Sequence, residues 1–133
     1  MKLLLDTCAL LWTVNDPNQL SGTAKKALID PSNSIHVSTI SFWEISLKAS
    51  IGKLQLEGVS PIDFPDMIQQ EGWDILPLEA HAAASFHKLP VVGKHKDPFD
   101  RMLIHIAIQG GYNFVSKDTA TKEYREHKLK VCW

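Results

Sequence analysis

Short apolar runs alternate along the chain with longer stretches in which apolar residues recur at helical spacing. The first run, Leu3–Leu5, leads directly into Asp6, and similar runs follow at intervals. A continuous apolar run bounded by polar residues is typical of a strand buried on both faces of a parallel sheet. We therefore predict strands at 3–5, 35–38, 73–78, 114–116 and 129–133.

Helices are predicted between these strands, at 9–14, 21–30, 41–51, 63–72, 79–89, 97–109 and 119–127. Several of them begin or end at characteristic residues. Ser21 is a suitable N-cap, Asp97-Pro98 is a strong helix start, and Gly110-Gly111 is typical of a helix end. In the helix at 41–51, Ser41 and Glu44 have the spacing of a capping box.

The alternation of strands and helices predicts an α/β fold, a three-layer αβα sandwich with a central, mostly parallel sheet. The chain has 133 residues, enough for one core, so residues 1–133 are expected to form a single domain. Right-handed crossovers bring the carboxyl ends of parallel strands to one edge of the sheet. Asp6 and Asp118, which follow the first and fourth strands, are therefore expected at the same edge.

Composition and charge narrow the chemistry further. The formal net charge is −1, so any contact with nucleic acid must depend on local basic patches. Cys8 and Cys132 lie near opposite ends of the chain and form no metal-spaced pair. The apolar start is interrupted at Asp6 and no stretch has the length that spans a bilayer, so we expect a cytoplasmic location.

Each acid near the predicted edge has an ordinary structural explanation. Asp6 and Asp118 can cap the helices that follow them. Glu44 can complete the capping box and form an ion pair with Lys48 four residues later. However, two acids at neighbouring strand ends repel each other unless a cation lies between them or one is protonated. The pair is therefore more informative than either acid alone.

The helix at 97–109 adds carboxylates at its start. Asp97 has the place of an N-cap, and Asp100 falls in the first turn, where the helix dipole favours an acid. Arg101 can be a solvated or paired surface residue. These explanations leave open why so many helix starts and strand ends at one edge carry acids. Clustered carboxylates bind hard cations such as Mg²⁺ and Mn²⁺, which activate water and stabilise the leaving oxygen of a phosphodiester.

Four motifs make the chain resemble a known family. They are Leu-Leu-Leu-Asp-Thr at 3–7, Ser-Phe-Trp-Glu-Ile at 41–45, Lys-Asp-Pro-Phe-Asp-Arg at 96–101 and Val-Ser-Lys-Asp at 115–118. In this order and spacing the chain resembles the PIN-domain nucleases over essentially its whole length, and most closely the VapC-type toxins of bacterial type II toxin–antitoxin pairs. The resemblance implies an Mg²⁺- or Mn²⁺-dependent endoribonuclease that hydrolyses RNA phosphodiester bonds.

The resemblance also assigns residues, motif by motif. The catalytic residues, which are also the metal ligands, would be Asp6, Glu44, Asp100 and Asp118. Residues supporting them would be Thr7, Asp97 and Ser116. The cations nearest to these acids in the sequence, and therefore expected to contact RNA phosphates, are Lys94, Lys96, Arg101 and Lys117. The partners implied are a second copy of the chain and a small antitoxin whose tail occupies the acidic groove, with an arginine among the carboxylates.

Two positions depart from the family pattern, and two other functions stay open. Cys8 stands where relatives more often carry a polar residue or histidine. His105 replaces a small residue, so the role of His105 is either packing or approach to substrate.

A receiver-type phospho-acceptor domain shares the small α/β fold and the strand-end Asp, but the acid pair expected after its first strand is missing. A catalytically inactive PIN fold acting as a binding module is the other alternative, and the complete set of four acids argues against it.

Overall fold

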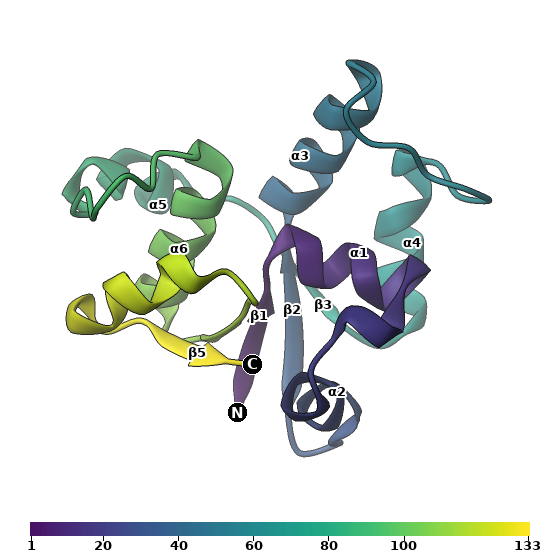
Figure 1. Ribbon diagram of the computed structural model, residues 1–133, viewed down its shortest axis with the longest axis horizontal. Coiled ribbons are helices and arrows are strands. Elements are labelled where there is room, and N and C mark those ends of the chain that lie inside the picture. The colour runs from purple at the N-terminus through teal and green to yellow at the C-terminus, as the bar shows by residue number, and fades with distance from the viewer.

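A five-stranded parallel sheet forms the centre of the computed structural model, which describes residues 1–133 (Figure 1). Its strands are β1 (Lys2–Leu5), β2 (Ser34–Ser38), β3 (Asp74–Leu76), β4 (Asn113–Val115) and β5 (Lys130–Cys132). They lie in the order β3-β2-β1-β4-β5, and every neighbouring pair is parallel. All five predicted strands are present, and the third and fifth are shorter than predicted.

The apolar run of β1 explains why this strand lies in the middle of the sheet. Leu3 and Leu5 point to one face and Leu4 to the other, because successive side chains of a strand alternate. All three side chains are completely buried. Leu3 and Leu5 belong to one hydrophobic cluster, and Leu4 belongs to another. The strand therefore needs cover on both faces, which the helices supply.

The helices form layers on the two faces of the sheet. They are α1 (Thr7–Asn15), α2 (Gly22–Ile29), α3 (Thr39–Ser50), α4 (Phe64–Gln70), α5 (Ala80–Ser85) and α6 (Pro98–Gly110), with 3₁₀ segments at Pro17–Gln19, Pro61–Asp63, Phe86–Lys88 and Thr119–His127. Figure 1 shows α1, α2 and α4 on one side of the sheet and α5 and α6 on the other. This is the predicted three-layer arrangement. None of the helices combines the length and apolar character that crossing a membrane requires.

The predicted start of the helix at 41–51 is wrong. The helix α3 begins at Thr39, and its N-cap is Ser38, whose Oγ accepts a hydrogen bond from the Ile40 amide at 3.1 Å. Ser41 lies inside the helix, fully buried, and accepts a hydrogen bond from the Thr7 hydroxyl instead. The capping box therefore does not exist, and Glu44 needs another explanation.

The strand order also bears on the alternatives. From β1 the chain passes to β2 and β3 on one side, and then returns to the other side of β1 to form β4 and β5. This differs from the 2-1-3-4-5 order of receiver-like, flavodoxin-type folds, so the phospho-acceptor alternative is wrong. The reversal lies between β1 and β4, and ligands of open α/β sheets bind at the carboxyl ends of strands at such a reversal.

Candidate active site

Asp6 lies at the reversal between β1 and β4. Its amide donates a hydrogen bond to the Val115 carbonyl of β4 at 3.1 Å, and its Oδ1 accepts from the Ala9 amide at 2.7 Å. Asp6 is therefore the N-cap of α1, which is one of the two roles considered for it from the sequence. The cap uses only Oδ1, so the acid can also take part in a site.

The electrostatic environment of Asp6 disfavours its ionised form. The side chain is buried, and this burial is the main reason why the pKa of Asp6 is raised from 3.8 to about 7. Hydrogen bonds from the Ser116 hydroxyl and the Ala9 amide act in the opposite direction. The negative charges of Asp100 and Asp118 nearby raise the pKa further.

Asp100 reaches the same point from the first turn of α6. Asp97 caps this helix, because its Oδ1 accepts from the amides of Phe99 at 2.8 Å and Asp100 at 3.1 Å. The pKa of Asp100 is raised to about 6. Burial is the largest cause, and the negative charges of Asp97 and Glu44 contribute to the same increase. The helix start predicted from the sequence thus positions one acid of the cluster and explains another as a cap.

Asp118 joins the cluster from the segment after β4. Its Oδ1 accepts from the Ala120 amide at 2.9 Å, so it caps the 3₁₀ segment Thr119–His127. Its own amide donates to the Ser116 Oγ at 3.1 Å. The Ser116 hydroxyl also lowers the pKa of Asp6, so this serine lies beside both strand-end acids.

Glu44 enters the site from α3. It is only 3% exposed and forms an ion pair with Lys48, as the sequence suggested. Its second oxygen, Oε1, is buried and has no hydrogen-bond partner. Thr7 donates to Ser41 Oγ at 3.0 Å, so it holds α1 against α3 and does not hydrogen-bond an acid.

His95 is a member of the site that the sequence did not indicate. Its Nε2 lies 3.6 Å from Asp100 Oδ2 and 3.8 Å from Asp118 Oδ2. The side chain is 10% exposed, and Nε2 has no hydrogen-bond partner. In the sequence, the only indication that this histidine belongs to the site is its position two residues before the helix cap Asp97, in a loop with basic residues. His95, Asp100 and Asp118 offer ligand atoms within 4.8 Å of one another, as a divalent cation would require.

The four predicted phosphate-binding cations divide into two groups. Lys94, Lys96 and Lys117 are exposed, and Lys117 Nζ lies 5.8 Å from the centre of the Trp12 ring. Arg101 differs, because its Nη2 donates to the Leu89 carbonyl at 3.1 Å and the Pro90 carbonyl at 3.4 Å. Its guanidinium therefore also holds the backbone before the 91–96 loop.

The two residues that depart from the family pattern now have locations. Cys8 is an exposed residue beside the acids, and partial desolvation by its neighbours together with the charges of Asp6 and Asp100 raises its thiol pKa to about 11. It is therefore a neutral thiol at physiological pH. His105 is buried away from the acids, where its Nε2 lies 3.0 Å from Ser85 Oγ. It connects α6 to α5, so its role is packing.

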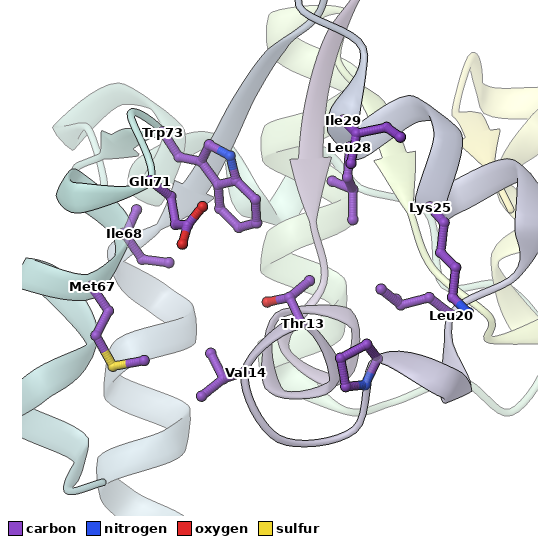
Figure 2. A pocket seen from close by; sticks show the side chains of 11 residues that line it. Thr13, Val14, Leu20, Lys25, Leu28, Ile29, Met67, Ile68, Glu71 and Trp73 are labelled. Atoms are coloured by element: carbon purple, nitrogen blue, oxygen red, sulfur yellow. The ribbon is translucent and has the colours of Figure 1, made fainter.

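The largest cavity of the protein does not contain the acids. It has a volume of about 850 Å³ and is lined mainly by apolar side chains from α1, α2 and α4 and from the segments that follow them (Figure 2). Figure 2 shows Val14, Leu28, Met67 and Trp73 around a common space. The acidic site and this apolar groove are separate features that share α1.

Comparison with known proteins extends the picture over the whole chain. Residues 3–126 match the family model described as PIN domain. Ribonuclease VapC22 of Mycobacterium tuberculosis (strain ATCC 25618 / H37Rv) is 28% identical over 133 residues, with 98% of each chain covered. Two solved structures share the fold. VapBC2 from Rickettsia felis, bound to a DNA fragment from its promoter, has a TM-score of 0.68 and 16% identity, covering 98% of this chain and 97% of that one. VapBC-5 from Mycobacterium tuberculosis, of the VapBC family of toxin-antitoxin systems, has a TM-score of 0.56 and 11% identity, covering 98% of each chain.

Proposed function

The chain belongs to the PIN domain family, and from this we propose that it is a divalent-metal-dependent endoribonuclease acting as the toxin of a type II toxin–antitoxin pair. The observation that carries the proposal is the convergence of acids from four different elements on the reversal between β1 and β4. The charges of Asp100 and Asp118 raise the pKa of Asp6, and those of Glu44 and Asp118 raise the pKa of Asp100. The similarity to a ribonuclease over 98% of the chain agrees with this.

We assign the metal, Mg²⁺ or Mn²⁺, to Asp6 and Asp100 as principal ligands. Their raised pKa values reflect burial and the charges of neighbouring carboxylates, a repulsion that a bound cation would relieve. A bound divalent cation makes water a better nucleophile and stabilises the oxygen that leaves a phosphodiester. Asp118 and Glu44 complete the negative site, either as further metal ligands or by orienting the attacking water. In-line attack would give a 5′-phosphate and a 3′-hydroxyl.

RNA binding requires positive charge beside this acidic site. Lys94 and Lys96 flank His95, whose ring contacts two of the acids, and Lys117 immediately precedes Asp118. All three lysines are exposed, so their charges are available to phosphates on either side of the scissile bond. Arg101 adds a fourth positive charge at the start of α6, where its Nη2 also donates to two backbone carbonyls.

The proposed antitoxin has two features of this surface to use. The likeness to a member of the VapBC family of toxin-antitoxin systems supports such a partner. The apolar groove between α1, α2 and α4 suits the apolar face of an amphipathic antitoxin helix (Figure 2). The acidic site suits an arginine in the antitoxin tail, because a guanidinium forms charge-assisted hydrogen bonds with carboxylates.

The proposed homodimer is supported by an exposed apolar stripe on α3. Trp43, Leu47 and Ile51 lie four residues apart, so they share one side of the helix. Their exposed fractions are 60%, 37% and 57%. Trp43 contacts Phe99 of α6 at 5.1 Å between ring centres, which extends the stripe towards the start of α6. A second copy of the chain would cover this surface.

The test is RNA cleavage by purified, antitoxin-free protein. Total bacterial RNA is incubated with Mg²⁺, Mn²⁺ or EDTA, and Asp100→Asn is compared with the matched variant Asp66→Asn, which changes an exposed acid on α4. We expect discrete, metal-dependent cleavage in the wild type and Asp66→Asn, and none in Asp100→Asn. Phosphatase treatment and end-labelling then identify the 5′-phosphate.

Two results would count against the proposal. Cleavage that survives in Asp100→Asn would show that the activity does not come from this site. Absence of cleavage with either metal, in protein that mass spectrometry shows to be free of antitoxin, would favour a PIN fold that acts by binding alone.

A further inference from the structure

The Nε2 atom of His95 is a buried polar atom at the acidic site whose interactions are not yet explained. The imidazole is nine-tenths buried, and its Nε2 has no hydrogen-bond partner. The nearest acceptors, at 3.6 Å on Asp100 and 3.8 Å on Asp118, are beyond the range of a hydrogen bond. A buried polar atom without a partner costs free energy, so its presence between two carboxylates calls for a ligand.

The other side of the ring is held by Tyr124. His95 Nδ1 lies 3.3 Å from the Tyr124 hydroxyl, and the two rings meet edge to face with 5.7 Å between their centres. Tyr124 is completely buried, so it fixes the direction of the imidazole. When Nδ1–H donates to the hydroxyl oxygen, Nε2 carries the lone pair that points at the acids. Histidines that bind metals usually have their second nitrogen held in this way.

The carboxylates complete a ligand set of mixed type. Two ligand atoms that each lie about 2.1 Å from the same divalent cation are roughly 3–4 Å from each other. The distances from His95 Nε2 to the Oδ2 atoms of Asp100 and Asp118 are close to this value. The three residues come from the 91–96 loop, the start of α6 and the segment after β4, so the fold and not local sequence brings them together.

We propose that His95 Nε2 is a ligand of the divalent cation, together with Asp100 and Asp118, and that this nitrogen makes the site prefer Mn²⁺ to Mg²⁺. Mg²⁺ is bound almost entirely through oxygen, whereas Mn²⁺, although it also favours carboxylates, is a first-row transition ion that accepts an imidazole nitrogen more readily than Mg²⁺ does. The inference rests on the proposed function, because it concerns which ion that same site holds.

The test measures metal binding without RNA. Mn²⁺ is titrated into the full-length protein at pH 8, free Mn²⁺ is followed by electron paramagnetic resonance, and pulsed measurements on the bound ion detect a coupled ¹⁴N nucleus. We expect imidazole ¹⁴N coupling in the wild type and in the matched variant His87→Gln, which changes an exposed histidine. We expect no coupling in His95→Gln, at least tenfold weaker Mn²⁺ binding, and a smaller preference for Mn²⁺ in competition with Mg²⁺.

A second variant guards against misfolding. Tyr124→Phe removes only the hydroxyl opposite Nδ1, and we expect it to weaken Mn²⁺ binding about tenfold while the ¹⁴N coupling remains. Circular dichroism verifies the fold of each variant, and the wild-type spectrum alone decides whether a nitrogen ligand exists.

The outcomes separate the inference from the function on which it rests. Bound Mn²⁺ without ¹⁴N coupling in the wild type, or coupling that persists in folded His95→Gln, would overturn the inference and leave the nuclease proposal intact. Such a result would mean that Nε2–H lies between the carboxylates as a structural group. Failure of the wild type to bind Mn²⁺ at all would overturn both.

Discussion

At the scale of single residues, Asp6 combines a structural and a chemical position. Its Oδ1 caps α1 at 2.7 Å from the Ala9 amide, while its buried charge faces Asp100 and Asp118. Asparagine keeps a carbonyl oxygen for the cap and removes the charge. The variant Asp6→Asn therefore separates the two roles, whereas Asp6→Ala would lose both.

We expect metal-free Asp6→Asn to be more stable than the wild type at pH 8. The folded-state pKa of Asp6 is about 7, above its ordinary value of 3.8, so between these pH values the folded protein binds more protons than the unfolded chain. This residue therefore lowers the free energy of unfolding as the pH rises from about 4 to 7. The shift corresponds to about 4 kcal/mol at most. Urea denaturation in EDTA at several pH values measures the difference between variant and wild type.

The pH dependence supplies the control for this expectation. At pH 4 the wild type and Asp6→Asn should have nearly equal stability, because Asp6 is then largely protonated in the folded protein. A saturating divalent cation should stabilise the wild type more than the variant. An Asp6→Asn variant that loses stability with rising pH as steeply as the wild type would contradict the assignment.

Glu44 and Lys48 should be coupled in a double-mutant cycle. Glu44 is buried and its Oε1 lacks a partner, so Lys48 is the main group that compensates its charge. In metal-free protein we expect Lys48→Met to cost about 2 kcal/mol of stability, and most of this loss to be absent when Glu44 is already Gln. Thermal or urea unfolding of the four proteins gives the coupling energy. Additive effects would show that the ion pair contributes nothing measurable, as exposed pairs often do.

At the scale of elements, α6 demonstrates what local sequence can predict. Asp97-Pro98 marks its start and Gly111, at φ 68°, marks its end, because these signals act on the backbone within a few residues. The helix therefore brings Asp100 to the site in a way that the sequence already implied.

Helix α3 and His95 demonstrate what local sequence cannot predict. Ser38 and Ser41 are both suitable helix caps, and the spacing to Glu44 favours Ser41. In the structure, however, Ser38 caps α3, and Ser41 forms a buried hydrogen bond with Thr7. His95 meets the acids only because its loop packs on Tyr124, which lies 29 residues later. The layers and parallel strands follow from hydrophobic pattern, whereas strand order and loop paths depend on tertiary packing.

The cap of α6 should respond differently to two substitutions. Asp97→Ala removes the acceptor of two amides and is expected to cost about 1 kcal/mol, whereas Asp97→Asn keeps the acceptor and should remain within a few tenths of a kcal/mol of the wild type. Asp97→Asn should also lower the pKa of Asp100, because the charge of Asp97 raises it. Unfolding measurements and NMR titration of the Asp100 carboxyl test both effects. Equal losses of stability in the two variants would show that charge and not capping is the contribution of Asp97.

At the scale of the whole molecule, the proposed interactions occupy different surfaces. The acids lie at the carboxyl edge of the sheet, the apolar groove lies between α1, α2 and α4, and the apolar stripe lies on α3. The antitoxin helix and a second copy of the chain can therefore bind through distinct side chains, whereas the antitoxin arginine and RNA share the acidic site. Variants in the apolar groove or in the apolar stripe should leave the other surfaces unchanged, which makes the antitoxin and dimer proposals separable by experiment.

The dimer surface gives the sharpest test at this scale. Burying the exposed indole of Trp43 and the neighbouring Leu47 and Ile51 would supply the apolar contact that a dimer core requires. We expect wild-type protein to sediment with twice the mass of one chain, and Trp43→Ala to raise the dimer dissociation constant by about tenfold or more. Ile51→Ala should have a smaller effect in the same direction. The matched variant Ile29→Ala, which truncates a 79% exposed side chain on α2, should leave the dissociation constant unchanged. A dimer that is equally stable in all three variants would place the interface elsewhere, and a monomeric wild type would remove the homodimer from the proposal.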